Sequence, residues 1–252
     1  MELRKYLEGL ELNSKASYTK QRNTLGVEAP ELPKLDEKEQ AFFSEKTILS
    51  FAYGVPEQSR KDIISSTLLA QLAANKKVSD DENIMEWYEA FIDVLAKVGW
   101  VIEGGDVQSF KSKSNLFEAE NVIIDILTSA FGANYIVVIK KTLEAIKKLA
   151  SDDRRIKAFE KSTSKISKSS FQIALVTEQN GLVSLKIGTF TLSATRDTIT
   201  VLFFKSDRQE TELNYISKQA TLDTDIFQEI RDLVKSKVGT FLRSSIAEIQ
   251  LS

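Results

Sequence analysis

The sequence predicts an α+β protein: an N-terminal helical bundle with one short hairpin, then a C-terminal antiparallel β-meander of about four strands packed against a long C-terminal helix. Apolar residues recur every three or four positions through most of the first 168 residues. From Ser169 the apolar period changes to two, and the helical period returns after Asp223. Helices and strands separated along a chain in this way are typical of α+β folds, whereas parallel α/β sheets alternate them.

Residues 1–35 are predicted to form an N-terminal helix and an extended arm. The helix is indicated by apolar residues at helical spacing, namely Leu3, Tyr6, Leu7 and Leu10. The arm is indicated by the polar composition of residues 13–35, which include Pro30 and Pro33. This segment is distinguished from the helical region that follows, and the alternative is that residues 1–35, 36–168 and 169–252 form one continuous domain.

Residues 36–168 are predicted as the helical region. Its first helix is capped by Asp36 and ends near Tyr53, before a break that leads to Pro56 at the start of the next helix. Another helix begins at Ser79 or Asp80 and ends at Gly99. Two short strands, 100–102 and 107–111, flank the turn Gly104-Gly105-Asp106 and are predicted to form a hairpin.

The most apolar stretch is 122–139, in which thirteen of eighteen residues are apolar and Asp125 is the only charge. Its length approaches that of a membrane-spanning helix, but Gly132-Ala133-Asn134 divide it into two short helices. Residues 122–150 are therefore predicted to be a helical hairpin in the protein core. The residues expected to be almost fully buried are Ile123, Ile126, Leu127, Ile136 and Ile139.

A following helix, from Asp152 and Asp153 to about Lys165, is predicted to be cationic on one side. The cations lie three or four residues apart, and they are Arg154, Lys157, Lys161, Lys165 and Lys168. A face of this kind is a candidate contact site for an anionic surface such as lipid headgroups or phosphates. The alternative is an ordinary solvated helix face.

Residues 169–252 are predicted to contain the β-meander and the C-terminal helix. Asn180-Gly181 indicates a tight hairpin between the first two strands. The apolar parity of the second strand switches at Gly188, which predicts a β-bulge there. Further strands are predicted at 198–204 and 213–216. A helix capped by Asp223 or Thr224 then runs to about residue 246, with Gly239 as a weak point.

The composition excludes several kinds of chemistry. The chain has no Cys and no His, so disulfides, thiol nucleophiles, zinc sites of the usual N/S type and His-based triads are excluded. Ser17–Lys20 and Ser162–Lys165 match the Ser-x-x-Lys spacing, but the companion elements of serine acyltransfer enzymes are absent, and so are glycine-rich phosphate loops. No catalytic residue, metal ligand or cofactor site is assigned. The sequence favours a non-enzymatic protein without deciding the question.

The net charge and the distribution of apolar residues limit which classes of partner and which cellular location are expected. The net charge is −2 and the pI is near 5.6, so no global attraction to nucleic acid is expected. A protein partner is favoured, an anionic membrane stays open, and nucleic acid is disfavoured because aromatic residues are not interleaved with the cations. The expected location is the cytoplasm, or export without a Sec signal, with no transmembrane segment.

Three stretches carry a resemblance to a known family: STLLAQLAANKK at 66–77, WYEAFIDVLAKVGW at 87–100 and SFQIALVTEQNG at 170–181. They resemble an uncharacterised microbial protein family of similar length. The resemblance implies one evolved unit from about residue 50 onward, and it implies no activity, cofactor or site residue.

Three functional hypotheses follow. The leading one is a soluble, non-enzymatic interaction or effector protein. The alternative is a membrane-active, toxin-like protein, pore-forming or lipid-binding, that uses the cationic helix, the apolar hairpin or both. The third is an enzyme that uses only carboxylate or Ser/Lys chemistry, for which convergent carboxylates in a deep pocket, or a serine beside a buried lysine, would be required.

Overall fold

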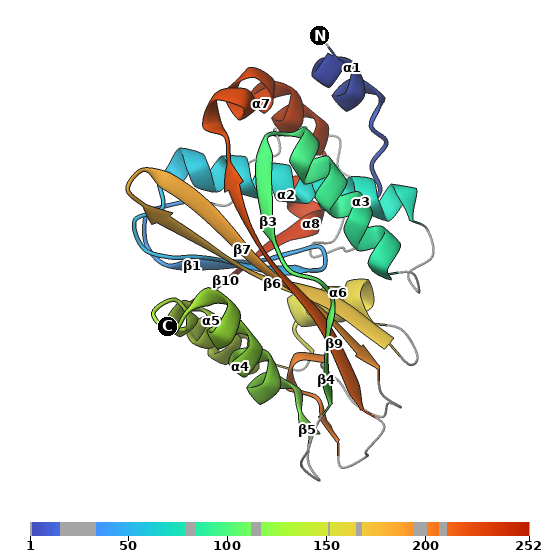
Figure 1. Ribbon diagram of the computed structural model, residues 1–252, viewed down its shortest axis with the longest axis vertical. Helices are drawn as coiled ribbons and strands as arrows, with labels where there is room; N and C mark the ends of the chain where they lie inside the picture. Colours follow the sequence, from blue (N-terminus) through green and yellow to red (C-terminus); the bar gives the residue numbers. More distant parts are fainter. Residues whose placement is uncertain are drawn as a thin grey trace.

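The computed structural model describes residues 2–15, 34–78, 84–111, 117–150, 152–164, 168–193, 201–206 and 211–251. Within these ranges the fold is a mixed α+β sandwich, in which helices cover both faces of one central sheet (Figure 1). The sheet, and the way each face is covered, determine which side chains remain available for function.

Eight strands of the described chain form the central sheet, in the order β10-β1-β2-β6-β7-β9-β3, with β4 also paired to β9. Only β2 and β6 run parallel, and the other described neighbours are antiparallel. The strand bounds are β1 (Gln40–Ser44), β2 (Thr47–Phe51), β3 (Trp100–Gly104), β4 (Gln108–Lys111), β6 (Lys168–Gln179), β7 (Leu182–Ser193), β9 (Glu212–Leu222) and β10 (Ile246–Ile249). A separate short pair joins β5 (Phe117–Glu118) to β8 (Lys205–Ser206).

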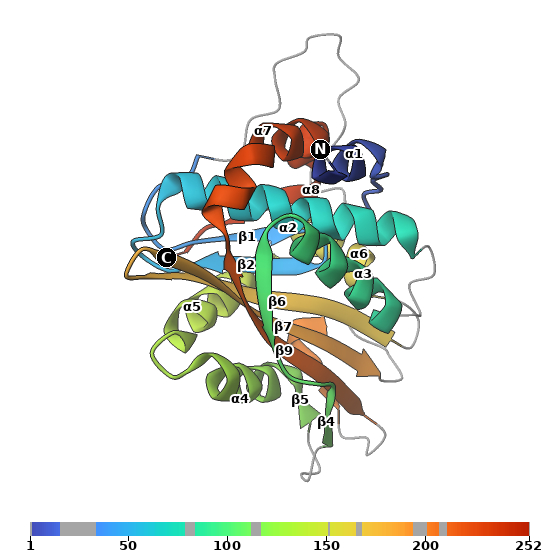
Figure 2. The same ribbon diagram turned by 45° about the horizontal axis from the view of Figure 1, so that its top comes forward.

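The helices form two outer layers (Figure 2). One face of the sheet is covered by α2 (Glu57–Lys77), α3 (Ile84–Lys97) and α8 (Leu242–Ser245), while α7 (Thr224–Gly239) packs on the outer side of α2 and α1 (Glu2–Gly9) packs beside α7. The other face is covered by α4 (Ala119–Phe131), α5 (Ile136–Lys147) and α6 (Arg154–Thr163), with a short 3₁₀ turn at Val201–Phe203. The predicted N-terminal helical bundle is wrong, because the sheet separates these helices.

The strand β6 shows why two cores form. Its residues alternate between the faces, so Ala174 and Val176 join the core beneath α2 and α3, while Ile173 and Leu175 join the core beneath α4 and α5. Every residue from Ser169 to Thr177 is buried, which is typical of a strand covered on both faces. The predicted four-strand meander is therefore too small: β6, β7 and β9 form its antiparallel part within a larger sheet.

The predicted helical hairpin at 122–150 is confirmed as α4 and α5. The five residues expected in the core are buried, with Ile126 the most exposed of them at 8%. Asp125 is exposed, and Gly132 ends α4 with a φ of 92°. None of the helices in the described ranges has both the length and the apolar character needed to cross a membrane.

The predicted helix over 36–53 is wrong, since this segment forms the hairpin β1–β2. The Asp36 side chain accepts the backbone N–H of Lys38 instead of capping a helix. Both strands are buried along their whole length, so no alternation of polar and apolar residues marks them, and a continuous apolar run resembles a buried helix. The turn is made at Glu45, whose φ is 50°.

The predicted hairpin around Gly104-Gly105-Asp106 is also wrong, although both strands exist. β3 and β4 pair with successive parts of β9 and not with each other. Gly104 lies so close to β9 that an added Cβ would be 2.8 Å from the Lys218 Cα, with φ at 137°. β3 and β4 thus pair with the long strand β9 instead of with each other. The spacing of residues near Gly104 cannot reveal a partner so distant in sequence.

Gly188 does not form a bulge. β7 pairs residue for residue with both β6 and β9 through this position. The apolar parity switches because the first half of β7 packs Leu185 and Ile187 under one helical layer, and the second half packs Phe190 and Leu192 under the other. Glycine avoids a close contact here, because a Cβ at 188 would lie 2.7 Å from Leu127 Cδ2 of α4 and one of the two would have to shift.

The C-terminal region differs from the prediction in two places. Asp223 caps α7 as expected, with its carboxylate accepting the N–H groups of Asp225 and Ile226. However, α7 ends at Gly239, and residues 246–249 form the edge strand β10 beside β1. Of the strand predicted at 198–204, residues 201–203 form the 3₁₀ turn, and residues 198–200 lie outside the described residues.

Candidate functional site

The cationic face predicted on the helix after Asp152 is present on α6. Asp153 caps this helix by accepting the Arg155 N–H at 2.8 Å, and its carboxylate also binds the Arg155 guanidinium at 2.7 Å and 3.0 Å. These contacts with Arg155 hold the pKa of the Asp153 carboxyl below its usual value. The apolar side of α6 packs Ile156 and Phe159 into the core, so the opposite side faces outward.

Arg154, Lys157 and Lys161 are all exposed and form what we call the α6 row. At 100° per residue they lie within about 60° of one another around the helix axis. Lys168 is exposed at the start of β6, and Lys165 lies outside the described residues. The structure therefore brings three of the five predicted residues onto one helix face.

The α6 row has no neutralising partner among the described residues. No described carboxylate forms an ion pair with Arg154, Lys157 or Lys161. Six other lysines do have such partners, at 2.6 to 3.2 Å, namely Lys61, Lys76, Lys97, Lys141, Lys147 and Lys205. Exposed Lys5, Lys38 and Lys140 resemble the α6 row, since none of them forms an ion pair with a described carboxylate. The row is therefore a local concentration of positive charge on a chain whose net charge is −2.

A second polar group, which the sequence did not indicate, lies inside the protein at the β1–β2 turn. Glu45 is fully buried and Lys46 is 2% exposed. The Glu45 carboxylate accepts Ser14 Oγ at 2.5 Å and the Lys15 backbone N–H at 3.1 Å, and it also accepts the Asn75 amide at 3.3 Å. The turn thus fastens the N-terminal segment and α2 to the end of the sheet.

The rest of this interior group is held by α2, α3 and the central strands. Gln71 accepts the Lys46 backbone N–H and the Thr47 hydroxyl. Trp87 donates its indole N–H to Asn75 at 2.8 Å, and its ring centroid lies 5.3 Å from the Lys46 ammonium. These contacts rigidify the join between α2, α3 and β1–β2. The charged pair Glu45-Lys46 lies within the segment predicted as a helix, and charged residues are usually exposed, so no sequence signal revealed its burial.

Arg60 is another buried charge that sequence reasoning missed. It is fully buried, and its guanidinium donates to the carbonyl oxygens of Val55 and Ala52 and to the Gln40 side chain. Burial lowers the pKa of Arg60 to about 10. Because its contacts join α2 to β1 and to the β2–α2 connection, Arg60 serves the fold.

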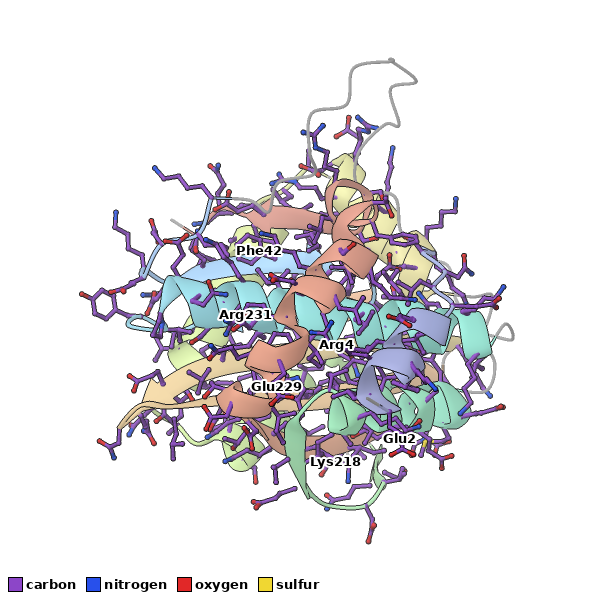
Figure 3. All side chains as sticks on the ribbon, turned by 90° about the horizontal axis from the view of Figure 1, so that it is seen from above. Glu2, Arg4, Phe42, Lys218, Glu229 and Arg231 are labelled. Atoms are coloured by element: carbon purple, nitrogen blue, oxygen red, sulfur yellow. The ribbon has the colours of Figure 1, made fainter. Side chains whose placement is uncertain are left out.

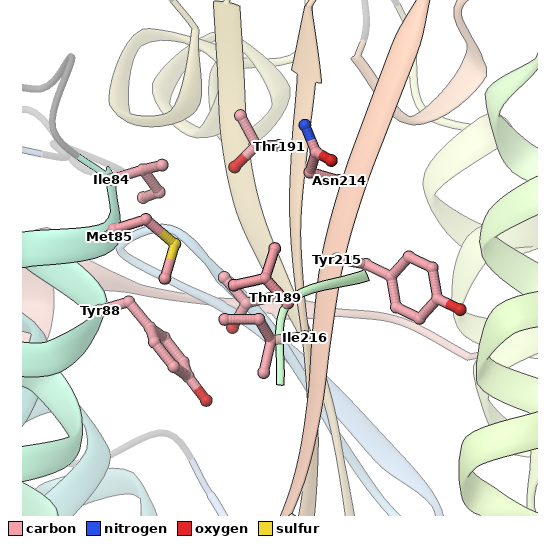
Figure 4. A pocket seen from close by; sticks show the side chains of 9 residues that line it. Ile84, Met85, Tyr88, Thr189, Thr191, Asn214, Tyr215 and Ile216 are labelled. Carbon is pink, nitrogen blue, oxygen red and sulfur yellow. The ribbon is translucent and has the colours of Figure 1, made fainter. Parts of the chain in front are cut away.

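Figure 4 shows a narrow cleft between the start of α3 and the sheet. Tyr88, Met85 and Ile84 line one side, and Thr189 and Ile216 lie on the strands, while the Tyr215 ring points to the opposite face. The cavity volume is about 20 Å³, which accommodates about one water molecule. Burial raises the pKa of Tyr88 above its usual value, so this phenol remains neutral.

One other titratable side chain, Lys186, has structural partners. Lys186 donates to the Phe131 carbonyl at the end of α4 and lies 4.6 Å from the Tyr135 ring centroid. Its partial burial lowers the pKa of Lys186. Within the described ranges, no three acidic side chains come together as a metal site would require.

No family model and no curated sequence matches this chain. Among solved structures, a delta-endotoxin aligns with TM-score 0.43 and 11% identity over 82% of this chain and 92% of its own. The Evf virulence factor aligns with TM-score 0.40 and 10% identity over 97% of this chain and 91% of its own.

Activated Cyt2Ba from Bacillus thuringiensis subsp. israelensis aligns with TM-score 0.27 and 10% identity, over 53% of this chain and 77% of its own. Scores and identities of this size mark only a distant likeness, and they carry no argument about what this chain does. The surface with the clearest chemistry of its own is the α6 row.

Proposed function

We propose that this chain is a non-enzymatic interaction protein that binds an acidic surface of a partner protein through the α6 row. The observation that supports this is the exposure of Arg154, Lys157 and Lys161 on one helix face, without an ion-pair partner among the described residues. Ion pairs across an interface steer association and set specificity. The function is therefore recognition of negative charge.

The interior polar groups support a non-enzymatic role. Glu45 and Lys46 are buried within the protein, where they join the N-terminal segment to the sheet and to α2. A catalytic group must be within hydrogen-bond reach of a substrate, and the water-sized cleft beside Tyr88 is too small to admit one. Glu45, Lys46 and the polar groups that contact them thus serve the fold.

The composition of α6 favours a protein partner over a membrane or a nucleic acid. A helix that lies in a membrane surface inserts its apolar face into lipid, but the apolar face of α6, with Ile156 and Phe159, packs on the sheet. Base stacking requires aromatic side chains beside the cations, and the exposed row contains none. Hydrogen-bonded carboxylates at matching spacing would satisfy the row directly.

The α4–α5 hairpin supports the same choice. Ile123, Leu127 and Ile139 are at most 1% exposed because they form the core on that face of the sheet. Inserting the hairpin into lipid would require the loss of this packing. Surface attachment is the only membrane contact compatible with the described conformation of these helices, and the row alone would supply about 1 kcal/mol per cation.

The test uses a short fluorescent polyglutamate peptide as a model acidic surface, with binding measured by anisotropy at low salt. Arg154→Glu with Lys157→Glu is expected to weaken binding roughly tenfold or more, because two attractions become repulsions. The matched control is Lys5→Glu with Lys38→Glu, which makes the same charge change at exposed positions outside α6. Equal binding by the α6 variant and this control would overturn the proposal.

Vesicle flotation distinguishes an anionic membrane from an acidic protein as the partner of the α6 row. Wild-type protein is mixed with phosphatidylglycerol vesicles and with phosphatidylcholine vesicles, at the same salt as the peptide assay. The proposal predicts that neither vesicle recovers more wild type than α6 variant. Flotation on phosphatidylglycerol that depends on the α6 row, without binding to polyglutamate, would replace the protein partner with an anionic membrane.

A further inference from the structure

The helix α7 carries an acidic counterpart of the α6 row on the opposite side of the molecule. Asp225, Glu229 and Asp232 are exposed, and at 100° per residue they lie within about 60° of one another. We call them the α7 row. Phe227, Ile230 and Val234 on the other side of α7 are buried, so the acidic face points away from the core (Figure 3 shows Glu229 on this surface).

Three cations near the α7 row, Arg231, Lys237 and Arg4, have other hydrogen-bond partners, while Lys235 is exposed one turn after Asp232. Arg231 binds both oxygens of Asp62 at 2.9 Å. Lys237 donates to the carbonyl oxygens of Glu8 and Leu10, and Arg4 donates to the backbone oxygen of Glu229 at 3.2 Å. Among the described residues, none forms an ion pair with the three carboxylates of the α7 row.

We propose that the acidic partner of the α6 row is the α7 row of a second copy of this chain. The inference rests on the function proposed above and names its partner. The α6 cations are spaced three and then four residues apart, and the α7 carboxylates four and then three. When the two helices lie antiparallel, both rows therefore have charges at about 0, 4.5 and 10.5 Å along the axis.

This alignment pairs Arg154 with Asp232, Lys157 with Glu229, and Lys161 with Asp225. Each contact joins opposite charges, whereas a parallel alignment places the middle charges about one residue out of register. The match in spacing, sign and exposure is what identifies a second copy as the occupant. Bidentate contact is available to Arg154, which has the planar guanidinium that suits a carboxylate.

The position of the two rows determines the form of the assembly. α6 packs on one face of the sheet, and α7 packs on α2, which covers the other face, so the rows of one molecule cannot meet each other. A contact between α6 of one copy and α7 of the next leaves one free row at each end. Such a head-to-tail contact forms an open chain or, if the rotation closes, a ring.

The test is sedimentation velocity of the full chain as a function of protein and salt concentration. Exposed ion pairs are individually weak, so association is expected at about 0.1 to 1 mM protein and low salt. The average mass should rise above the monomer value of 28.3 kDa. It should return to that value at about 0.5 M NaCl, where the screening length is about 4 Å. A constant monomer mass under all conditions would overturn the inference.

Charge-reversal variants test the pairing itself. Arg154→Glu with Lys157→Glu reverses two charges of the α6 row, and Glu229→Lys with Asp232→Lys reverses their proposed partners. Each variant alone should remain monomeric, and an equimolar mixture should associate again, because reversed rows then face each other. Circular dichroism checks that each variant is folded. Failure of the mixture to associate, when wild type does, would contradict the pairing.

The polyglutamate assay makes the two possible failures distinguishable. The Glu229→Lys, Asp232→Lys variant keeps the α6 row, so it should bind polyglutamate at least as well as wild type. If the peptide binds through α6 but reversing α7 does not change the average mass, the second copy is the wrong partner and the proposed function stands. If reversing α6 leaves peptide binding unchanged, the proposed function itself fails.

Discussion

The ion pair between Asp62 of α2 and Arg231 of α7 allows a quantitative test of how α7 is held on the fold. Two parallel hydrogen bonds of 2.9 Å join the guanidinium to the carboxylate, and Gln58 donates a third bond to Asp62. The side chains differ in exposure, since Asp62 is 5% exposed and Arg231 is 29% exposed. Removing Arg231 therefore leaves a carboxylate that is buried, whereas removing Asp62 leaves a guanidinium that is partly exposed to water.

Arg231→Ala is expected to cost more stability than Asp62→Ala. Without the arginine, the buried carboxylate retains the Gln58 amide as its side-chain donor among the described residues, and an uncompensated buried charge costs about 3 kcal/mol or more. Without the aspartate, the arginine can turn towards water, so the loss is about 1 to 2 kcal/mol. The double variant should cost less than the sum of the single losses.

The assay is urea unfolding at pH 7, with the free energy of unfolding obtained by linear extrapolation. The matched control is Lys61→Ala, which removes an exposed pair with Glu57 on the same helix, where the side chains are 41% and 54% exposed. That control should lose about 0.5 kcal/mol or less. If Asp62→Ala destabilised the protein as much as Arg231→Ala, the burial argument would be refuted.

Three further predictions concern the other helical layer, the α6 cap and the interior polar group. Gly188→Ala should cost about 1 to 3 kcal/mol in urea unfolding, because its Cβ would overlap Leu127 Cδ2 at 2.7 Å; a smaller loss when Leu127→Ala is added would confirm that contact. Asp153→Ala should cost about 1 kcal/mol at pH 7. Because the pKa of Asp153 is lowered from 3.8 by Arg155, this contribution is complete above the unfolded-state pKa, and is lost as pH falls through the folded-state value. The difference between wild type and Asp153→Ala should therefore shrink on acidification, and an unchanged difference would contradict the cap. Glu45→Gln should speed hydrogen exchange in residues 2–15, since an amide NH₂ cannot accept Ser14 and Lys15 as the carboxylate does; unchanged exchange would show that Glu45 does not anchor this segment.

The segments predicted correctly from sequence have patterns that follow from local physics. Asp223 before an amphipathic run predicted the cap of α7, and Gly132 within an apolar run predicted the break between α4 and α5. A capping side chain or a residue with positive φ acts within one turn of the chain. Such features are therefore visible in the sequence alone.

The segments predicted wrongly depend on distant partners. The Gln40–Phe51 hairpin lacks polar alternation because both of its faces are covered, and Ile246–Ile249 becomes a strand because it pairs with β1. At Gly188 the parity change reflects which helical layer covers each half of β7. The period of apolar residues indicates which face of a helix or strand is buried. It does not indicate which other segment covers that face.

For the candidate site, the sequence by itself determined that α6 has an apolar side and a row of cations three or four residues apart, and that histidine and cysteine chemistry is excluded. Only the tertiary structure decided that Arg154, Lys157 and Lys161 face outward without described partners, while Glu45, Lys46 and Arg60 are buried. The physical reason is that helical spacing fixes which side chains share a face. Whether that face meets water, another helix or a carboxylate depends on chain segments distant in sequence, such as those that bring Ser14 to Glu45 and Arg231 to Asp62.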